Sequence, residues 1–450
     1  MRVLFSPIGG TDPISNFKDG AMLHICRHYM PDKVYLYLSK EMCEFHDMDN
    51  RYLYCLDKLG DMVSHEFEVE LIRRDDVEDV QIFDSFMEEY RGICAGIMKA
   101  YPDAEIYVNV SSGTPAMKSV LLMLSILSEG KIIPIQVATP VRKINPHAED
   151  RKNYDCCTYW ELNEDNESGA ENRCAVASSR NWILELRKEV AIRHVEAYDY
   201  VAALRELDKE NHILSSEVIN LLKAADARLK LDFSEMQLCM NKLPQGSDFI
   251  PVKDMAVKPL VEYTLGLAIK QKREEYSDFI RAISPILLDL YDMILQQECG
   301  INITKNYGIK KFDSRTNVSR YVWDLDKVNG NADLKKIFSN AYPGGLRAGD
   351  ITNDNLRKLI TTLCENADTV EKVESIEAVE RWVRNPAAHE IVSITDEAIQ
   401  KKAGITSGKI IATIKILVDR YVIKGRYKNV WNSYDAMNQT IIDAIRNMTV

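Results

Sequence analysis

Three residues near the C-terminus have side chains that could together break a phosphodiester bond. They are Arg384, Asn385 and His389, which lie in the segment RNPAAH. An arginine can hold a phosphate through two parallel hydrogen bonds, and a histidine exchanges protons near neutral pH. When the 2′-hydroxyl of RNA attacks the adjacent phosphate, charge grows on the phosphate oxygens while a proton moves. The set therefore predicts RNA cleavage that needs no metal ion.

The surrounding sequence predicts how these side chains are held. Residues 371–384 form a predicted helix whose apolar positions fall on one face. Those positions are Val373, Ile376, Val379 and Val383. The helix should end before Pro386, because proline disfavours helical geometry in the preceding residue. Asn385 can then cap a second helix with Pro386 at its first position. This puts His389 in the first turn of the second helix.

The spacing of arginine and histidine does not by itself identify a site. Four to six residues also separate such a pair at Arg142/His147, Arg187/His194 and Arg205/His212. A capped helix boundary with an incidental Arg and His explains the asparagine and the proline equally well. Residues 401–428 carry a net charge of +7 from eight Lys/Arg and one Asp, although the whole chain has −11. This basic segment either forms a solvated helix face or attracts RNA toward His389.

The first third of the chain alternates strand and helix patterns. Short β-branched and aromatic runs occupy residues 2–8, 33–39, 67–73, 104–111 and 131–138. Helical patterns lie between them, for example at 82–101 and 115–130. This alternation predicts βαβ units and a mainly parallel, Rossmann-like sheet. An acidic stretch at 163–173 is predicted to be a linker, and helical patterns dominate from residue 174 onward.

Polar loops that contain glycine follow two of the predicted strands. The first strand runs into SPIGGTDPISN, and the strand at 104–111 runs into NVSSGTPAMKS. Pro115 suits the first turn of a helix, whose free amides and dipole favour an anion. Ser or Thr before Pro is also an ordinary helix cap. Because open parallel sheets bind ligands at the carboxyl ends of strands, the two loops are predicted to share one anionic ligand.

Two common nucleotide-binding motifs do not fit this chain. Gly113 and Lys118 echo a P-loop, but Met117 stands where the second glycine belongs. No G-x-G-x-x-G follows a predicted strand. A P-loop-like NTPase, in which Lys118 would touch phosphate, is kept only as a third alternative.

The composition is typical of a cytoplasmic protein with two or three domains. A chain of 450 residues exceeds what one core usually supports. No secretory signal is visible, and the longest apolar run, 120–127, is too short to span a membrane. The ten cysteines include no C-x-x-C pair and are expected to be reduced thiols. His24-x-Cys26-x-His28 could face a metal ion, but no partner cluster follows, so neither a metal site nor a required cofactor is predicted.

The segments SPIGGTDPI and NVSSGTPAMKSVL resemble the CARF domain of type III CRISPR-associated ribonucleases. This resemblance implies a Rossmann-like homodimer that binds a cyclic oligoadenylate, with four or six adenylates, across its two-fold axis. A symmetric polyanion matches a symmetric dimer, which offers each loop twice. The implied ligand contacts are Gly9, Gly10, Thr11, Asp12, Ser111, Ser112, Gly113 and Thr114. Some family members slowly cleave the ring, and Thr114 is the candidate participant.

The segment RNPAAH is similar to the R-x4–6-H motif of HEPN ribonucleases. This resemblance implies an all-helical, metal-independent endoribonuclease whose active site forms between two subunits, with Arg384, Asn385 and His389 catalytic. The implied architecture is an α/β CARF domain at 1–165, a helical linker domain at 174–290 and an all-α HEPN domain at 291–450. We expect a single-stranded RNA endoribonuclease of antiviral defence, activated by the cyclic ligand. The alternative is a non-catalytic nucleotide sensor whose helical C-terminal part binds nucleic acid or a partner.

Overall fold

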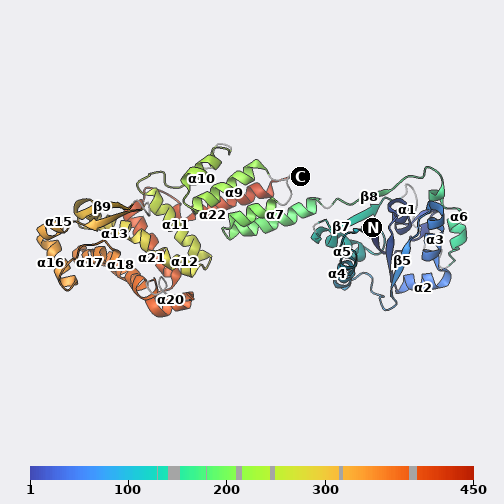
Figure 1. Ribbon diagram of the computed structural model, residues 1–450, viewed down its shortest axis with the longest axis horizontal. Coiled ribbons are helices and arrows are strands. Elements are labelled where there is room, and N and C mark those ends of the chain that lie inside the picture. Colours follow the sequence, from blue (N-terminus) through green and yellow to red (C-terminus); the bar gives the residue numbers. More distant parts are fainter. Residues whose placement is uncertain are drawn as a thin grey trace. The chain divides into compact units, whose positions relative to one another are not determined.

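The computed structural model describes most of the chain in two compact units. The described residues are 1–128, 130–139, 153–178, 180–208, 215–243, 249–313, 318–384 and 393–449. The first unit comprises Met1–Leu186 and the second Arg187–Thr449, and each is described by itself (Figure 1). Among the described residues, no helix has the length and apolar character needed to cross a membrane.

A six-stranded sheet forms the centre of the first unit. Its order is β5-β4-β1-β6-β7-β8, and every neighbouring pair is parallel except β7 with β8. The strands are β1 (Arg2–Pro7), β4 (Lys33–Ser39), β5 (Glu68–Arg74), β6 (Glu105–Asn109), β7 (Ile132–Val137) and β8 (Cys174–Val176). A small hairpin, β2 (Ile14–Ser15) with β3 (Lys18–Asp19), follows β1. The five strands predicted from sequence are therefore confirmed, with ends that differ by at most two residues.

Helices cover both faces of this sheet (Figure 1). The helices on one face are α1 (Ala21–Tyr29) and α3 (Arg51–Val63), and on the other α4 (Phe83–Ala100) and α5 (Pro115–Leu127). Two further helices of this unit are α2 (Lys40–Asp49) and α6 (Cys156–Glu161). Side chains alternate along β1, because Leu4 enters the core beneath α1 while Val3 and Phe5 enter the core beneath α4 and α5. The doubly covered α/β architecture predicted from the sequence is confirmed.

The sheet reverses its direction of growth at β1. From β1 the chain adds β4 and β5 on one side, and then returns to place β6 on the other side. The loop that follows β1 leads to α1 on one face of the sheet, and the loop that follows β6 leads to α5 on the other face. The carboxyl edge between β1 and β6 is therefore a topological switch point. Such a switch point is where open α/β sheets bind ligands.

The stretch predicted as a linker, residues 163–173, packs against the first unit instead. Asn163 and Asp165 are buried within the short helical turn η2 (Glu164–Asn166) and its flank. The chain then forms β8, a strand that the sequence analysis missed because three residues carry no recognisable alternation. Acidic composition predicted solvent exposure, but buried arginine partners keep these acidic residues in the fold.

The second unit is mainly helical. Its N-terminal helices are α7 (Arg180–Glu196), which begins at the end of the first unit, α8 (Tyr200–Leu207), α9 (Ser216–Leu229), α10 (Phe233–Met240), α11 (Lys258–Lys272), α12 (Tyr276–Arg281), α13 (Ser284–Glu298) and α14 (Ile303–Tyr307). Then follow α15 (Leu325–Gly330), α16 (Ala332–Ala341), α17 (Asn353–Leu363), α18 (Ala367–Val379), α20 (Asp396–Ala403), α21 (Ser407–Val418) and α22 (Ser433–Arg446), with a short turn η5 (Val430–Asn432). An antiparallel hairpin, β9 (Gly308–Asp313) with β10 (Val318–Trp323), interrupts the helices and was not predicted.

The predicted helix before the RNPAAH segment is present. Its expected inner face is buried: Val373, Ile376, Val379 and Val383 are at most 4% exposed. The α-helical geometry ends at Val379, and a wider π-helical turn, η3 (Glu380–Arg384), completes the helix. A second π-turn, η4 (Asp419–Ile423), ends α21. Single π-turns of this kind are frequent at functional sites, and no pattern in the sequence predicted either of them.

Candidate functional site

The two predicted glycine loops meet at the switch point of the sheet. A Cβ atom added to Gly9 would lie 2.7 Å from the Gly113 amide nitrogen, so the two backbones are in direct contact. Gly113 also has a φ of 83°, in the left-handed region that favours glycine. A Cβ there would meet the Met117 sulfur at 2.9 Å. Glycine is therefore required at both positions for the loops to close on each other.

Asp12 stabilises the first loop through hydrogen bonds to the backbone. It is 5% exposed, and its two carboxylate oxygens accept hydrogen bonds from the Gly9 and Met22 amides, each at 3.0 Å. Burial raises the pKa of the Asp12 carboxyl above its usual value, although these backbone hydrogen bonds oppose the shift. Its carboxylate is thus engaged with the backbone, which makes Asp12 a support for the loop.

Asn109, at the end of β6, holds the second loop in the same manner. Its side-chain oxygen accepts from the Ser111 and Ser112 amides at 2.9 and 3.2 Å, and its amide group donates to Ser6 Oγ at 2.9 Å. Thr114 caps α5 by accepting from the Met117 amide at 3.4 Å, while its hydroxyl donates to the Val80 carbonyl at 2.6 Å. The predicted capped helix start at Pro115 is therefore confirmed.

Two cavities open beside the contact between these loops. One, of about 300 Å³, is lined by six of the predicted residues: Gly9, Gly10, Thr11, Ser111, Ser112 and Gly113. The other, of about 430 Å³, lies on the other side and is lined in part by Gly9, Gly10, Gly113 and Thr114. Of the eight residues predicted to contact the ligand, only Asp12 does not line either cavity. Seven of the eight predicted residues thus line cavities at the carboxyl edge of the sheet.

Two basic side chains that the sequence analysis did not assign to the ligand also line the smaller cavity. They are Lys118, one turn into α5, and Arg173, which directly precedes β8. The sequence could have predicted Lys118 as a ligand contact, because Lys118 lies one turn after the predicted helix start at Pro115. No local pattern marked Arg173, because it reaches the cavity only through the packing of residues 163–173 on the domain.

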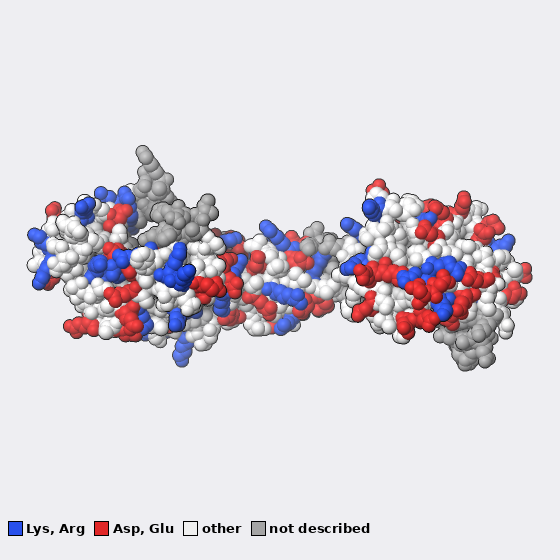
Figure 2. Space-filling model, turned by 90° about the horizontal axis from the view of Figure 1, so that it is seen from below, with Lys and Arg blue, Asp and Glu red and all other residues white. Residues whose placement is uncertain are grey.

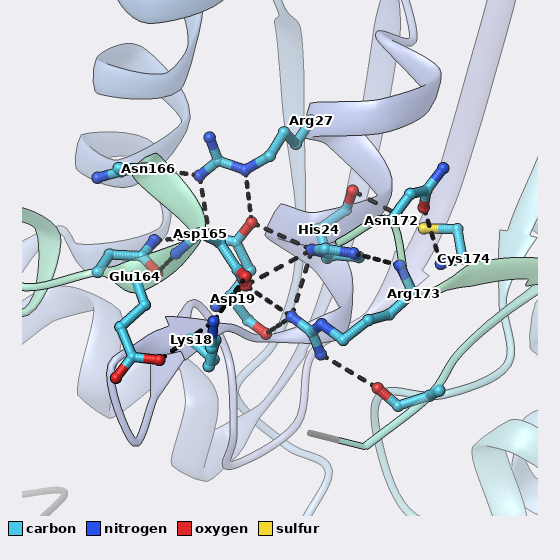
Figure 3. A network of polar contacts seen from close by, with 12 residues as sticks. Lys18, Asp19, His24, Arg27, Glu164, Asp165, Asn166, Asn172, Arg173 and Cys174 are labelled. Atoms are coloured by element: carbon cyan, nitrogen blue, oxygen red, sulfur yellow. Dashed lines mark hydrogen bonds and ion pairs between the residues drawn. The ribbon is translucent and has the colours of Figure 1, made fainter. Parts of the chain in front are cut away.

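A buried polar network holds Arg173 in place (Figure 3). Its guanidinium contacts Asp165 at 2.7 Å, and its backbone amide donates to His24 Nε2 at 3.0 Å. The proton of that ring is therefore on Nδ1, which lies 3.3 Å from the Asp19 carboxylate. Burial alone would raise the pKa of Asp19, but hydrogen bonds from His24 and Arg27, with the Arg27 charge, bring it down to about 2.

The same network has the residue types of a metal site, but its charge is already balanced. Ligand atoms of Asp19, His24 and Asp165 lie within 4.8 Å of one another. The guanidinium groups of Arg27 and Arg173 contact these two carboxylates at 2.6 and 2.7 Å. These arginines supply the positive charge that a cation would bring. Among the described residues, the cluster is best explained as a structural ion network.

The histidine pair considered from the sequence lies partly in this network. The His24 and His28 rings meet edge to face, with centroids 4.5 Å apart. Burial raises the pKa of the Cys26 thiol far above its usual value, so Cys26 stays protonated and is a poor metal ligand. The His24-x-Cys26-x-His28 segment is accordingly a packed helix face.

Two of the three residues predicted to be catalytic lie outside the described part of the chain. Asn385 and His389, and the predicted second helix, lie outside the described residues; Arg384 is the last residue of η3. Arg381 is described: its Nε lies 3.3 Å from Glu377, and its guanidinium is 5.8 Å from the centre of the Trp382 ring. The catalytic roles of Arg384, Asn385 and His389 stay predictions.

The basic segment 401–428 is partly neutralised. Arg420 pairs with Asp368 at 2.8 Å. Burial lowers the pKa of Lys415, which lies over the Trp431 ring. The lysines that remain exposed are Lys401, Lys402, Lys409, Lys424 and Lys428. Because Arg420 is paired, the charge that this segment has available is smaller than +7. Figure 2 shows basic and acidic side chains intermixed on the face of the molecule in view.

Family models match three parts of the chain. They are described as the Cas_Csm6 CARF domain at residues 68–174, the Csm6 6H domain at 177–229 and the Cas_Csm6 HEPN domain at 249–442. The CRISPR system endoribonuclease Csm6 of Mycobacterium tuberculosis is 30% identical over 406 residues, covering 90% of this chain and 91% of that protein. The chain belongs to the Csm6 family. The endoribonuclease Csm6 of Enterococcus italicus is also similar, 32% identical over 211 residues, which are 46% of this chain and 48% of that protein.

A solved Csm6 structure has the same fold over nearly the whole chain. It is Enterococcus italicus Csm6 bound to cyclic hexa-2′-fluoro-hexa-dAMP, with a TM-score of 0.66 and 20% sequence identity. It covers 98% of this chain and 99% of that one. The Csm6 assignment confirms the family and the architecture expected from the sequence: an α/β CARF domain, a helical middle domain and a helical HEPN domain. The activity common to the named Csm6 relatives is that of a CRISPR endoribonuclease.

Proposed function

We propose that this Csm6-family protein is a metal-independent endoribonuclease for single-stranded RNA, switched on by a cyclic oligoadenylate. The ligand binds the CARF loops across two copies of the chain, and the HEPN motif of the same two copies cleaves RNA. The observation that carries this proposal is the closure of the Gly9 and Gly113 loops at the switch point of the sheet. Lys118 of α5 and Arg173 line the cavity beside these loops.

The chemistry of this cavity suits an adenylate ring. The dipole at the start of α5 favours an anion. Lys118 adds a positive charge near the phosphates, and Arg173, which is paired with Asp165, lines the same cavity. A volume of about 300 Å³ is at the small end for a ligand pocket. One copy of the chain would therefore hold only part of the ring, and a second copy related by two-fold symmetry would hold the rest.

The family relationship supports the same conclusion. The solved Enterococcus italicus Csm6, which shares the fold, was bound to a cyclic hexa-adenylate analogue. The ligand can activate the enzyme only by binding the cleavage-competent state more tightly than the resting state. The ring size depends on how two subunits meet around the ligand. Activation by cyclic tetra-adenylate is therefore to be compared with activation by cyclic hexa-adenylate.

The proposed chemistry places Arg384 and His389 on the RNA. Arg384 clamps the scissile phosphate while its oxygens gain charge. His389 exchanges a proton with the attacking 2′-hydroxyl or the leaving oxygen, and Asn385 orients the linkage. The sets from two subunits share one cleft.

Ring cleavage by Thr114 would require its hydroxyl to leave the Val80 carbonyl. The boundaries at residues 165, 174 and 290 likewise stay predictions.

One experiment tests activation directly. Protein is mixed with single-stranded RNA in EDTA, with and without each cyclic oligoadenylate, and cleavage is followed on a gel. We expect one ring size to stimulate cleavage at least tenfold. The proposal is refuted if neither ring stimulates cleavage.

A second experiment tests the catalytic residues. Replacing His389 with alanine should abolish cleavage, while binding of the cyclic ligand, measured by calorimetry, is unchanged. The matched control is His194→Ala, since His194 lies in α7, far along the sequence from both sites. Undiminished cleavage by the His389→Ala variant would place the active site elsewhere.

A further inference from the structure

A cavity in the second unit is lined by residues that directly precede the proposed catalytic motif in the sequence. Its volume is about 660 Å³. The end of α18 and the turn η3 supply Glu377, Glu380 and Arg381, and the start of α17 supplies Asn353, Asp354 and Arg357. Glu380 and Arg381 precede Arg384 by four and three residues. All of its lining residues belong to the second unit.

One wall of the cavity holds a buried arginine that is only partly paired. The Arg357 side chain is 10% exposed, and its Nη2 donates to Asp354 Oδ1 at 2.7 Å. Its Nε has no hydrogen-bond partner among the described residues. A buried guanidinium nitrogen without an acceptor is costly, so a ligand or an ordered water near this wall would stabilise it.

The turn η3 offers the cavity a carboxylate, that of Glu380. Glu380 Oε1 accepts from Ser284 Oγ at 2.6 Å and from Asn353 Nδ2 at 3.0 Å, which fixes the side chain. No described residue donates to Glu380 Oε2. Asp354 differs, because its second oxygen already accepts from the Tyr342 hydroxyl at 2.7 Å. The Glu380 side chain is thus fixed in place at the start of η3, with Oε2 able to accept a hydrogen bond from a ligand.

The charge of the cavity does not suit a phosphate. Its three acids, Asp354, Glu377 and Glu380, equal in number its three arginines, Arg281, Arg357 and Arg381. A polyanion would meet as much repulsion as attraction there. A neutral, planar group with both donors and acceptors fits such a balanced lining.

Apolar and aromatic surface accompanies these polar groups. Pro285, Leu288 and Ile351 line the cavity. Trp382 follows Arg381 in the sequence; it is not one of the lining residues, but it is 56% exposed. Proteins that bind unpaired RNA stack bases on exposed aromatic rings and on arginine planes.

We propose that this cavity is a base-recognition pocket that takes the guanine next to the scissile phosphate. This inference rests on the proposed ribonuclease function. Guanine offers two neighbouring donors, N1–H and the 2-amino group, and Glu380 Oε2 can accept from both. It also offers two acceptors, O6 and N7, to an arginine fork, and Arg381 is the most exposed candidate. In the same orientation, adenine presents an acceptor at N1 and has no 2-amino group, so it leaves Glu380 unmatched, and its 6-amino donor meets the arginine that guanine O6 would bond.

The test compares RNA substrates that differ in one base. Otherwise identical uridine-rich oligonucleotides carry guanosine, inosine or adenosine at each position around the cleavage site, and kcat/KM is measured with the full chain and its activator. At one position, guanosine should be preferred over adenosine at least fivefold, and inosine should fall between them. Glu380→Gln keeps the oxygen that accepts from Ser284 and replaces the other with a donor. It should reduce the preference to less than twofold while cleavage of the adenosine substrate changes less than threefold.

The control is Glu374→Gln, an exposed position on the same helix outside the cavity, which should keep the full preference. A wild-type preference below twofold would overturn the inference, as would a preference that survives Glu380→Gln. An equal loss on all substrates would also overturn it, because Glu380 would then only support the fold. Failure of the proposed function looks different: the wild-type chain would cleave none of the substrates with either cyclic ligand.

Discussion

A fully buried ion pair ties the middle helices to the HEPN helices. Arg228 of α9 and Glu262 of α11 are both 0% exposed, and two hydrogen bonds of 2.8 and 3.0 Å join them. Arg228 also donates to Ser433 Oγ of α22 at 2.8 Å and lies 4.0 Å from the centre of the Tyr434 ring. Arg228 falls in the match to the 6H model, whereas Glu262 and Ser433 fall in the match to the HEPN model.

Replacing Glu262 with glutamine should strongly destabilise the second unit. The change keeps the shape of the side chain but leaves the Arg228 charge buried without a counter-charge. Breaking a buried pair in this way costs about 3–5 kcal/mol. Since 1.36 kcal/mol corresponds to a factor of ten, protection of core amides should fall by roughly two to four orders of magnitude.

Hydrogen–deuterium exchange of peptides from α9, α11 and α22 measures this loss within the intact chain. Glu217→Gln, at an exposed position of α9, is the control and should stay within about 0.5 kcal/mol of the wild type. The double replacement Arg228→Met with Glu262→Leu should be less harmful than Glu262→Gln, because apolar residues of similar size avoid the buried charge. A Glu262→Gln protein that loses less than about 1 kcal/mol in all three helices would refute the reasoning.

Three further predictions concern the first unit. Gly9→Ala should weaken binding of the cyclic ligand at least tenfold by calorimetry, because its Cβ would lie 2.7 Å from the Gly113 amide nitrogen; unchanged affinity would show that the loops need not touch. The pKa of Asp19 is about 2 in the fold against 3.8 without it, so its contribution to stability is complete above pH 4 and is lost as the pH falls through 2. The advantage of the wild type over Asp19→Asn in urea unfolding should shrink by about 2 kcal/mol between pH 6 and pH 2, and a constant difference would contradict this. Cys157 is the exposed cysteine, so a thiol reagent should label it first in the native protein, and Cys157→Ser should remove that fast phase; fast labelling that persists in the variant would contradict it.

Local patterns in the sequence were sufficient for the parts of this fold that have their own periodicity. The strands β1, β4, β5, β6 and β7 are β-branched, aromatic-rich runs, and each was placed to within two residues. The buried face of α18 followed from a spacing of three and four residues, which one turn of helix dictates. The start of α5 followed from Thr114 and Pro115, because capping depends on neighbouring residues alone. The grouping of the two glycine loops needed only one topological rule, that ligands bind at the carboxyl ends of parallel strands.

The sequence by itself thus determined the α/β and helical classes, the two glycine loops and the candidate motif at residues 384–389. Tertiary structure alone decided what depends on residues far apart in the chain. It buried Asp12 beneath its loop, brought Arg173 to the cavity beside the glycine loops through Asp165 and His24, and enclosed the Arg228–Glu262 pair. The physical reason is the range of the interactions: capping and periodicity act over one or two turns, whereas burial of a charge depends on every segment that packs around it.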